Sequence, residues 1–245
     1  MALLMRAVPL VALALAGCAA PRGAPPQAEL AMLKPVAKPG DLVATELAFA
    51  ALAAEKGRWA AFAAYADPAG IMFVPEKVNA RQWLKGRAEP TAPLAWDPYE
   101  VWSSCDGSVG VTRGGWVSGT KKGWFTTVWK RQADGSYRWL LDHGDADAKI
   151  GPVPELIEAH VAECPEPDWH PEEDLVSVAP GNGEFFGGAS DDGTLRWGGR
   201  IDRWNGRIVT IEVWNGTAFQ KVLHQVIAPP PADTAGPGTA AKPAA

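Results

Sequence analysis

Apolar residues recur at helical spacing in the segment that follows Asp41. They are Leu42, Val43, Leu47, Phe49 and Leu52. Asp41 stands where the N-cap of a helix belongs, and the run to Lys56 is followed by Gly57, a typical C-terminal stop signal. The pattern therefore predicts a helix between Asp41 and Gly57 with one apolar face.

Shorter elements are predicted after this helix. Trp59 and Phe62 share one face of a second helix over residues 58–65, which ends ahead of Asp67-Pro68 because a residue before proline disfavours helical dihedrals. A brief strand over residues 70–75 and one or two capped helical turns over residues 79–84 follow.

From Leu94 onward the pattern changes to strands rich in Trp, Val and Thr, separated by turns that contain glycine. The predicted strands cover residues 99–104, 108–117, 123–132 and 136–143. Asp106-Gly107 and Ala133-Asp134-Gly135 are hairpin signals, so consecutive strands are expected to pair antiparallel.

The second of these hairpins has a predictable register. A three-residue loop at residues 133–135 pairs Trp129 with Trp139 and Thr127 with Leu141. One face then carries Phe125, Thr127, Trp129, Tyr137, Trp139, Leu141 and His143. The other face is more polar and carries Thr126, Val128, Lys130, Arg138, Leu140 and Asp142.

The C-terminal third is predicted to begin with a helix over residues 155–163. Strands are expected at residues 195–202, 207–214 and 219–227, with turns at Asn205-Gly206 and Asn215-Gly216. The Gly-rich segment 181–187 lacks the Lys-Ser/Thr ending of a phosphate loop and is interpreted as a flexible turn. Residues 151–228 are interpreted as a helix plus a small β extension packed on the first domain, with an independent domain as the alternative.

The N-terminus is typical of an export signal. One positive charge, Arg6, precedes an apolar run over residues 7–16, which is too short for a bilayer span of about 20 residues. Leu15-Ala16-Gly17-Cys18 resembles the bacterial lipobox, which implies removal of residues 1–17 and acylation of Cys18 as a lipid anchor. The resemblance, with Ala19 after the cysteine, implies an outer-membrane lipoprotein facing the periplasm. The alternative is a plain secretory signal with an incidental cysteine.

Composition limits the partners and the folded length. The 245 residues are 47% hydrophobic and 21% charged with a net charge of -5, which argues against nucleic-acid binding because that needs a concentrated basic surface. Residues 18–39 and 229–245 are rich in Pro and Ala and are expected to be a disordered linker and tail.

Two cysteines remain when Cys18 is set aside. In an oxidising envelope compartment, the even pair Cys105 and Cys164 favours a disulfide. A competing interpretation is a metal site built from His160, Cys164 and His170, although this spacing matches none of the strong zinc patterns.

The middle of the chain resembles a known superfamily. The order helix, short helix, strand, short helix and long antiparallel strands is similar to nuclear transport factor 2, SnoaL-like cyclases and ketosteroid isomerases. Four segments are also similar in sequence to SnoaL-like proteins of unknown function. They are Glu46-Leu-Ala-Phe49, Gly110-Val-Thr-Arg-Gly-Gly-Trp116, Thr127-Val-Trp-Lys-Arg131 and Asp134-Gly-Ser-Tyr-Arg-Trp-Leu-Leu-Asp-His-Gly-Asp145. The resemblance implies an α+β domain over residues 40–150, with a cone-shaped curved antiparallel sheet wrapped on the N-terminal helices and a pocket at its wide end.

Three functions stay open at this point. The preferred one is a non-enzymatic lipoprotein module that binds a small apolar molecule or an envelope protein without a cofactor. Its expected ligand-binding residues are Phe125, Thr127, Trp129, Trp139, Leu141 and His143. The runner-up is an acid/base isomerase, dehydratase or hydrolase-like enzyme that uses His143 and Asp145. The third is a structural module whose cone is filled by Trp side chains. A homodimer is expected because members of the superfamily often pair sheet against sheet.

Overall fold

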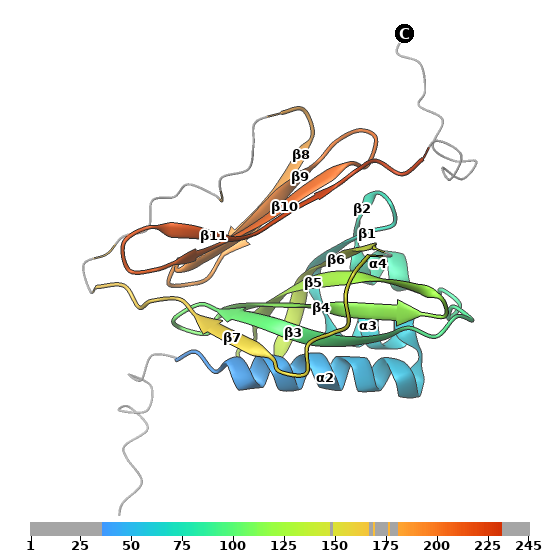
Figure 1. Ribbon diagram of the computed structural model, residues 1–245, viewed down its shortest axis with the longest axis horizontal. Helices are drawn as coiled ribbons and strands as arrows, with labels where there is room; N and C mark the ends of the chain where they lie inside the picture. Colours follow the sequence, from blue (N-terminus) through green and yellow to red (C-terminus); the bar gives the residue numbers. More distant parts are fainter. Residues whose placement is uncertain (1–35, 148, 167–168, 170–175, 177–180, 232–245) are drawn as a thin grey trace, which may run out of the picture. The chain divides into compact units, whose positions relative to one another are not determined.

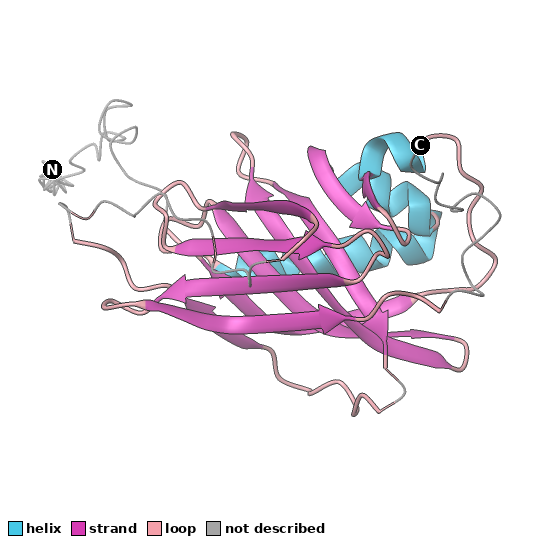
Figure 2. Ribbon diagram, turned by 90° about the horizontal axis from the view of Figure 1, so that it is seen from above, coloured by secondary structure: helices cyan, strands magenta, loops and turns pink. Residues whose placement is uncertain are grey.

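The structure is a computed structural model that describes residues 36–147, 149–166, 169, 176 and 181–231. Three helices, α2 (Pro39–Lys56), α3 (Arg58–Tyr65) and α4 (Ala80–Leu84), contribute to the core on one face of a seven-stranded sheet. A second sheet of four strands contributes to the core on the opposite face (Figures 1 and 2). The predicted fold class, α+β with a curved sheet and a C-terminal β extension, is confirmed.

The helices follow the apolar pattern with one correction at the start. Helix α2 begins at Pro39, and Lys38 occupies the N-cap position without a side-chain hydrogen bond, so the predicted N-cap at Asp41 was wrong. Proline fits the first turn because its missing N–H has no partner there, and Asp41 lies in that turn near the positive end of the helix dipole. None of the helices in the described ranges combines the length and hydrophobicity needed to cross a bilayer.

The first sheet has the strand order β2-β1-β6-β5-β4-β3-β7. Its strands are β1 (Ala66–Phe73), β2 (Lys77–Asn79), β3 (Ala95–Ser103), β4 (Val109–Ser118), β5 (Lys121–Arg131), β6 (Tyr137–Ala146) and β7 (Glu158–Val161). Neighbouring strands are antiparallel except β1 with β6 and β3 with β7, which are parallel. The four long strands predicted from the alternation of apolar residues are present.

The helix predicted over residues 155–163 was wrong, because this segment contains strand β7. Strand β7 pairs with β3, and the N–H of Ala162 just beyond it donates to the carbonyl of Ser103 at 2.9 Å. The edge of β3 carries backbone N–H and C=O groups that need hydrogen-bond partners. Pairing with this edge stabilises the segment as a strand by more than its weak local preference for a helix.

The β5–β6 hairpin contains a bulge that the sequence did not predict. Trp129 lies opposite Trp139 as expected, but the register shifts after this pair, so that Val128 faces Leu141 and Thr127 faces Asp142. The predicted Thr127–Leu141 pair was therefore wrong. Because a slip of one residue moves side chains to the opposite face of a strand, Leu141 packs toward the second sheet, away from Trp139, and Asp142 turns toward the helices.

The second sheet is antiparallel throughout, with the order β11-β10-β9-β8. Its strands are β8 (Glu184–Ala189), β9 (Leu195–Ile201), β10 (Arg207–Trp214) and β11 (Phe219–Ile227). Strands β9 to β11 were predicted, whereas β8 lies largely in the segment interpreted as a flexible turn. Glycines weaken the strand signal of this segment, but pairing with β9 supplies its backbone hydrogen bonds.

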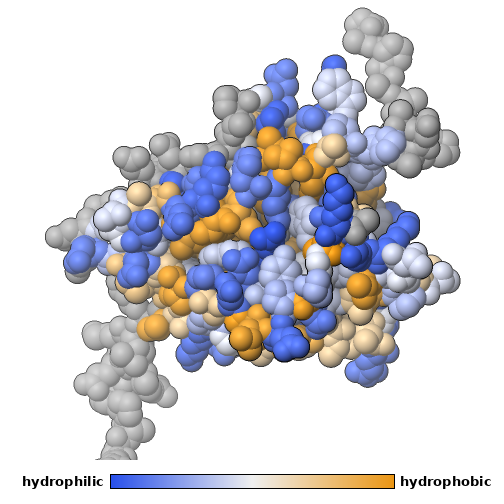
Figure 3. Space-filling model, in the orientation of Figure 1, coloured by the Kyte–Doolittle hydropathy of each residue, from blue (hydrophilic) through white to orange (hydrophobic). Residues whose placement is uncertain are grey.

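Two hydrophobic clusters cover the two faces of the first sheet. The cluster on the helix side includes Leu42, Phe49, Phe62, Trp96, Phe125, Trp129 and Trp139. The cluster between the sheets includes Trp102, Val111, Val128, Leu141, Leu195, Trp197, Val209 and Ile211. On the face shown in Figure 3, the hydrophobic residues form separate groups divided by hydrophilic ones. Scattered exposure of this kind does not by itself mark a docking surface.

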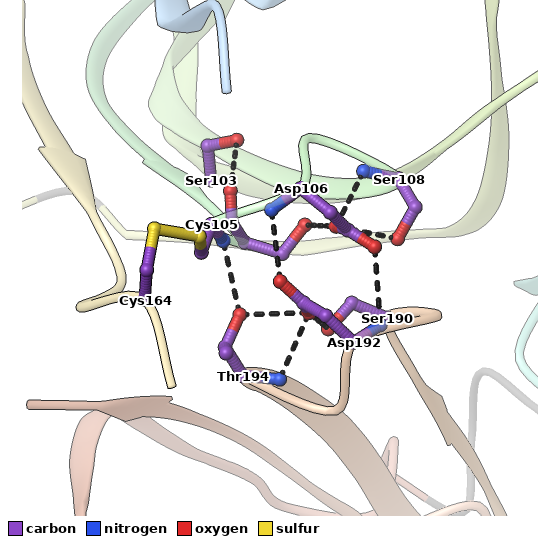
Figure 4. Close-up of a disulfide and its surroundings, with 9 residues drawn as sticks. Ser103, Cys105, Asp106, Ser108, Cys164, Ser190, Asp192 and Thr194 are labelled. Carbon is purple, nitrogen blue, oxygen red and sulfur yellow. Dashed lines mark hydrogen bonds between the residues drawn. A yellow bond between two sulfur atoms is a disulfide. The ribbon is translucent and has the colours of Figure 1, made fainter. Parts of the chain in front are cut away.

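Two hairpin turns of related sequence connect the sheets (Figure 4). Ser104-Cys-Asp-Gly-Ser108 links β3 to β4, and Ser190-Asp-Asp-Gly-Thr194 links β8 to β9. One oxygen of Asp106, and likewise of Asp192, accepts hydrogen bonds from hydroxyls of its own turn. The other oxygen accepts the backbone N–H of the opposite aspartate, at 2.8 Å from Asp106 N–H and 3.0 Å from Asp192 N–H. We call these two segments, residues 104–108 and 190–194, the turn clasp.

The predicted disulfide lies beside the turn clasp. Cys105, inside the first turn, is bonded to Cys164 just after β7, and this prediction is confirmed. The backbone N–H of Cys105 donates to Thr194 Oγ1 at 3.0 Å, and that of Asp191 donates to Ser108 Oγ at 2.8 Å. The contact between the sheets is thus polar at this end, next to the apolar cluster, and the disulfide ties the segment after β7 to the β3–β4 turn.

Candidate functional site: an aromatic pocket beside the first sheet

A pocket of about 480 Å³ opens on the helix side of the first sheet. Its apolar lining consists of Phe49, Phe62, Phe73, Leu94, Trp96, Trp116 and Phe125. Its other side chains include Arg58, Ser118, Lys121, Asp142, His143 and Asp145. A pocket of this size, with aromatic walls and a set of polar side chains beside them, can hold a small molecule.

Phe49 on α2 organises the aromatic wall. Its ring centroid lies 5.0 Å from that of Phe62 on α3, 4.8 Å from that of Trp96 on β3 and 5.9 Å from that of Trp129 on β5. Most of these contacts are edge-on or tilted, which is the arrangement that ring quadrupoles favour. Trp129 and Trp139 are fully buried and fill the interior, whereas Phe49 and Trp96 also line the pocket.

A buried carboxyl group anchors this wall. Glu46 is completely buried, and its two oxygens accept hydrogen bonds from Trp96 Nε1 at 2.7 Å and from Thr112 Oγ1 at 2.6 Å. Thr112 Oγ1 in turn accepts from Trp129 Nε1 at 2.9 Å. Burial raises the pKa of Glu46 to about 7, although the hydrogen bonds from Thr112 and Trp96 oppose this shift.

Asp142 brings a second carboxyl group to the pocket. The bulge in the β5–β6 hairpin turns it toward the helices, where Oδ2 accepts a hydrogen bond from Thr127 Oγ1 at 2.9 Å. Burial raises the pKa of Asp142 to about 6, and the Thr127 hydrogen bond opposes the shift. The negative charge of Asp142 also raises the pKa of Glu46.

His143 belongs to the pocket lining, but its Nε2 is directed to the second sheet. Its Nε2 lies 2.9 Å from Gln225 Oε1, and Gln225 Nε2 donates to Thr126 Oγ1 at 3.0 Å. Burial, with a smaller effect from the nearby Arg207 charge, lowers the pKa of His143 to about 3, so its ring is neutral near pH 7. A neutral ring of such low basicity, with one nitrogen committed to Gln225, does not fit the role of general base that was considered for the pair of His143 and Asp145.

The other predicted ligand-binding residues do not lie together in the pocket. Phe125 lines the pocket, Thr127 holds Asp142, and Trp129 and Trp139 lie in the core. Leu141 belongs to the cluster between the sheets. Cys18, the expected lipid anchor, lies outside the described residues.

Sequence analysis missed both carboxyl groups of the site. Glu46 carried a usable signal, because it interrupts the apolar stripe of α2 at positions four after Leu42 and three before Phe49. An acidic residue at that spacing points into the core. Asp142 carried no such signal, because its orientation depends on the bulge.

The structure does not bring together the metal site predicted from His160, Cys164 and His170. Cys164 is held in the disulfide, and His170 lies outside the described residues. His160 instead shares a cluster with Glu100 and Glu158, whose ligand atoms all lie within 4.8 Å of one another. Arg113 Nη1 lies 3.6 Å from Glu100 Oε2 and already balances part of the negative charge there.

No protein-family model matches this sequence, and no curated protein matches it. Among solved structures, the chain is similar to a candidate ketosteroid isomerase from Parabacteroides distasonis, with a TM-score of 0.36 and 17% identity over 48% of this chain and 98% of that chain. It is also similar to a candidate ketosteroid isomerase from Kribbella flavida, with a TM-score of 0.33 and 13% identity over 47% of this chain and 84% of that chain. Similarity of this degree assigns neither activity nor ligand.

Proposed function

We propose that this protein is a lipid-anchored envelope lipoprotein that binds a small, mainly apolar molecule in the aromatic pocket. The observation that carries the proposal is the pocket itself, about 480 Å³ in volume and walled by aromatic side chains from α2, α3, β3, β4 and β5. Pockets between about 300 and 1,000 Å³ with such walls suit ligands of drug-like size.

The direct test is binding of a neutral fluorescent molecule, N-phenyl-1-naphthylamine, to the Cys18→Ser chain. We expect saturable binding that Ala146→Trp weakens by about tenfold or more, since Ala146 lines the pocket and is exposed. Ala63→Trp, on an exposed position of α3 outside the pocket lining, is the matched control and should bind as the parent does. Absence of binding, or equal loss in both variants, contradicts the proposal.

The anchoring part of the proposal is supported by the lipobox-like Leu15-Ala16-Gly17-Cys18 segment. Several acyl chains on one residue hold a protein stably at a membrane, whereas a single chain binds only marginally. In cells, Cys18→Ser should move the protein from the membrane fraction to the soluble envelope fraction. Persistent membrane retention, or failure of the parent to incorporate radiolabelled palmitate, contradicts this part alone.

A second candidate function, acid/base catalysis, is favoured by Asp142. Its carboxyl group lines an aromatic pocket and has a pKa of about 6, near the value that suits a general base at neutral pH. The test is exchange of the α-hydrogen of 2-tetralone for deuterium from heavy water. Asp142 would take the α-proton as the C–H bond breaks and its electron pair moves into an enolate. The carboxyl proton would then exchange with heavy water, and Asp142 would return a deuteron to the same carbon of the enolate. Exchange that persists in Asp142→Asn, or is absent in the parent, removes this candidate.

A further inference from the structure

We infer that the ligand of the pocket is an amphipathic anion that enters apolar end first and leaves its negative group at the mouth, beside Lys121 and Arg58. This inference rests on the proposed binding function and adds the chemical class of the ligand.

The pocket is graded from a polar mouth to an apolar interior. Phe49, Phe62, Trp96 and Phe125 are only 1%, 9%, 7% and 8% exposed, so they form the deep walls. Lys121, Asp145 and Ala146 are exposed, and Arg58 is half-buried, so these residues form the mouth. A molecule with one apolar and one charged end can satisfy both regions in only one orientation.

The acidic groups around the mouth already have partners. Asp145 Oδ1 accepts a hydrogen bond from Ala146 N–H at 2.8 Å, and the positive charge of Arg207 acts on the same carboxylate. Glu89, near Arg58, uses its two carboxylate oxygens on the N–H groups of Trp59 and Ala60 at the start of α3, at 2.9 and 2.8 Å.

The basic groups of the mouth keep donors available. Arg58 Nη2 donates to the carbonyl of Ala92 at 3.0 Å, but the buried Arg58 Nε has no hydrogen-bond partner among the described residues. Within the same residues, Lys121 forms no salt bridge. Two cations in the pocket lining, of which Lys121 forms no salt bridge among the described residues, favour a carboxylate, sulfonate or phosphate group there.

The interior of the pocket is unfavourable for the negative group of the ligand. Asp142 lines the pocket, and Glu46 lies behind Trp96 and disfavours further negative charge nearby. A buried anion beside these carboxyl groups would lose its hydration and gain repulsion. The charge pattern therefore selects the orientation of the ligand as well as its class.

A charge series on one scaffold tests the inference in the Cys18→Ser chain by titration calorimetry. The three compounds are naphthalene-2-carboxylate, naphthalene-2-carboxamide and 2-naphthylmethylammonium. We expect the carboxylate to bind about tenfold more tightly than the amide, and the ammonium to bind most weakly. Lys121→Gln should reduce the carboxylate-to-amide ratio of affinities by about fivefold, which is the scale of one partly screened charge pair.

Lys130→Gln is the matched control, because Lys130 is an exposed lysine on the same strand outside the pocket lining. It should keep the parent ratio. Equal binding of the three compounds, or the same ratio in the parent and in Lys121→Gln, overturns the inference and leaves the binding function standing. Binding of none of the three, together with no binding of N-phenyl-1-naphthylamine, overturns both.

Discussion

The two faces of the first sheet bury aromatic and aliphatic side chains in different ways. On one face, three helices meet a curved sheet and leave a pocket beside Glu46 and Asp142. On the other face, a second sheet packs its own apolar side chains against β4, β5 and β6 and is fastened by the turn clasp. The two faces also bury different ionisable groups. Glu46 and Asp142 lie on the helix side, where burial raises the pKa of each, and His143 is directed to the second sheet, where burial lowers its pKa.

The division also bears on assembly. The face of the first sheet opposite the helices is covered by a second sheet of the same chain. The expected homodimer remains a prediction, and a dimer that formed through this face would have to displace the second sheet.

The largest expected effect concerns the disulfide beside the turn clasp. Replacing both Cys105 and Cys164 with Ser should lower the free energy of unfolding by about 4 kcal/mol, because the bridge closes a long loop and restricts the unfolded chain. The two cysteines are 59 residues apart. Urea unfolding of the parent and the double variant measures the difference, and a change below about 1 kcal/mol would refute this prediction.

The next effect concerns the helix side. Glu46 has a pKa of about 7 when folded and 4.5 as its ordinary value, so the folded state holds its proton over a pH range in which the unfolded state has lost it. The free energy of unfolding should therefore fall by about 3 kcal/mol between pH 4 and pH 8 through Glu46 alone. Asp142 adds a decline of the same sign between about pH 4 and pH 6.

Glu46→Gln isolates the contribution of Glu46. The variant should show a flatter dependence of stability on pH than the parent, whatever its absolute stability. Denaturant unfolding at several pH values gives both curves, and parallel curves would show that Glu46 does not titrate as its burial implies.

An intermediate effect is expected in the turn clasp. Asp106→Asn replaces the carboxylate that accepts the N–H of Asp192 with an amide, which offers either its NH₂ group or a neutral oxygen, a weaker acceptor. Asp192→Asn makes the same change opposite the N–H of Asp106. Each variant should lose about 2 kcal/mol of stability, since a partly buried donor is left without its charged acceptor. The reciprocal geometry predicts similar losses for the two variants.

Asp134→Asn is the matched control for the clasp. Asp134 makes the same local bonds to Ser136 in the β5–β6 turn, from N–H at 2.9 Å and from Oγ at 2.6 Å, but it is exposed. Its loss of stability should stay well below the losses at Asp106 and Asp192, because Asp134 is exposed to solvent. Equal losses at Asp134, Asp106 and Asp192 would mean that local turn bonds, and not the pairing between turns, supply the stability.

The smallest effect concerns His143 and has the opposite sign to that of Glu46. His143 has a folded pKa of about 3 and an ordinary value of 6.5, so acidification protonates the unfolded chain first. The parent should lose about 1 kcal/mol of stability between pH 7 and pH 5.5 through this group, and His143→Gln should remove that loss. An unchanged slope in the variant would place the source of the pH dependence elsewhere.

Local signals explain most of the elements that were predicted correctly. Helix α3 and strands β10 and β11 match their predicted ranges, because glycine turns, Asn-Gly pairs and apolar periodicity act within a few residues of chain. The disulfide followed from the count of cysteines once Cys18 was assigned to the lipid anchor. Neither the ranges of these elements nor the cysteine pair depends on which residues lie nearby in the folded protein.

The site depended on relations between distant segments. Strand β7 forms because the edge of β3 needs backbone partners, and β8 forms because β9 supplies them to a glycine-rich segment. The bulge opposite Val128 and Trp129 sends Asp142 into the pocket and His143 toward Gln225, reversing the sides predicted from alternation.

The sequence by itself therefore determined the strand-rich α+β class, the cysteine pair and the aromatic character of the interior. Only the tertiary structure decided which ionisable groups that interior contains, and where an opening is left. The reason is that alternation specifies two faces of a strand but not a change of register, and a single extra residue exchanges those faces.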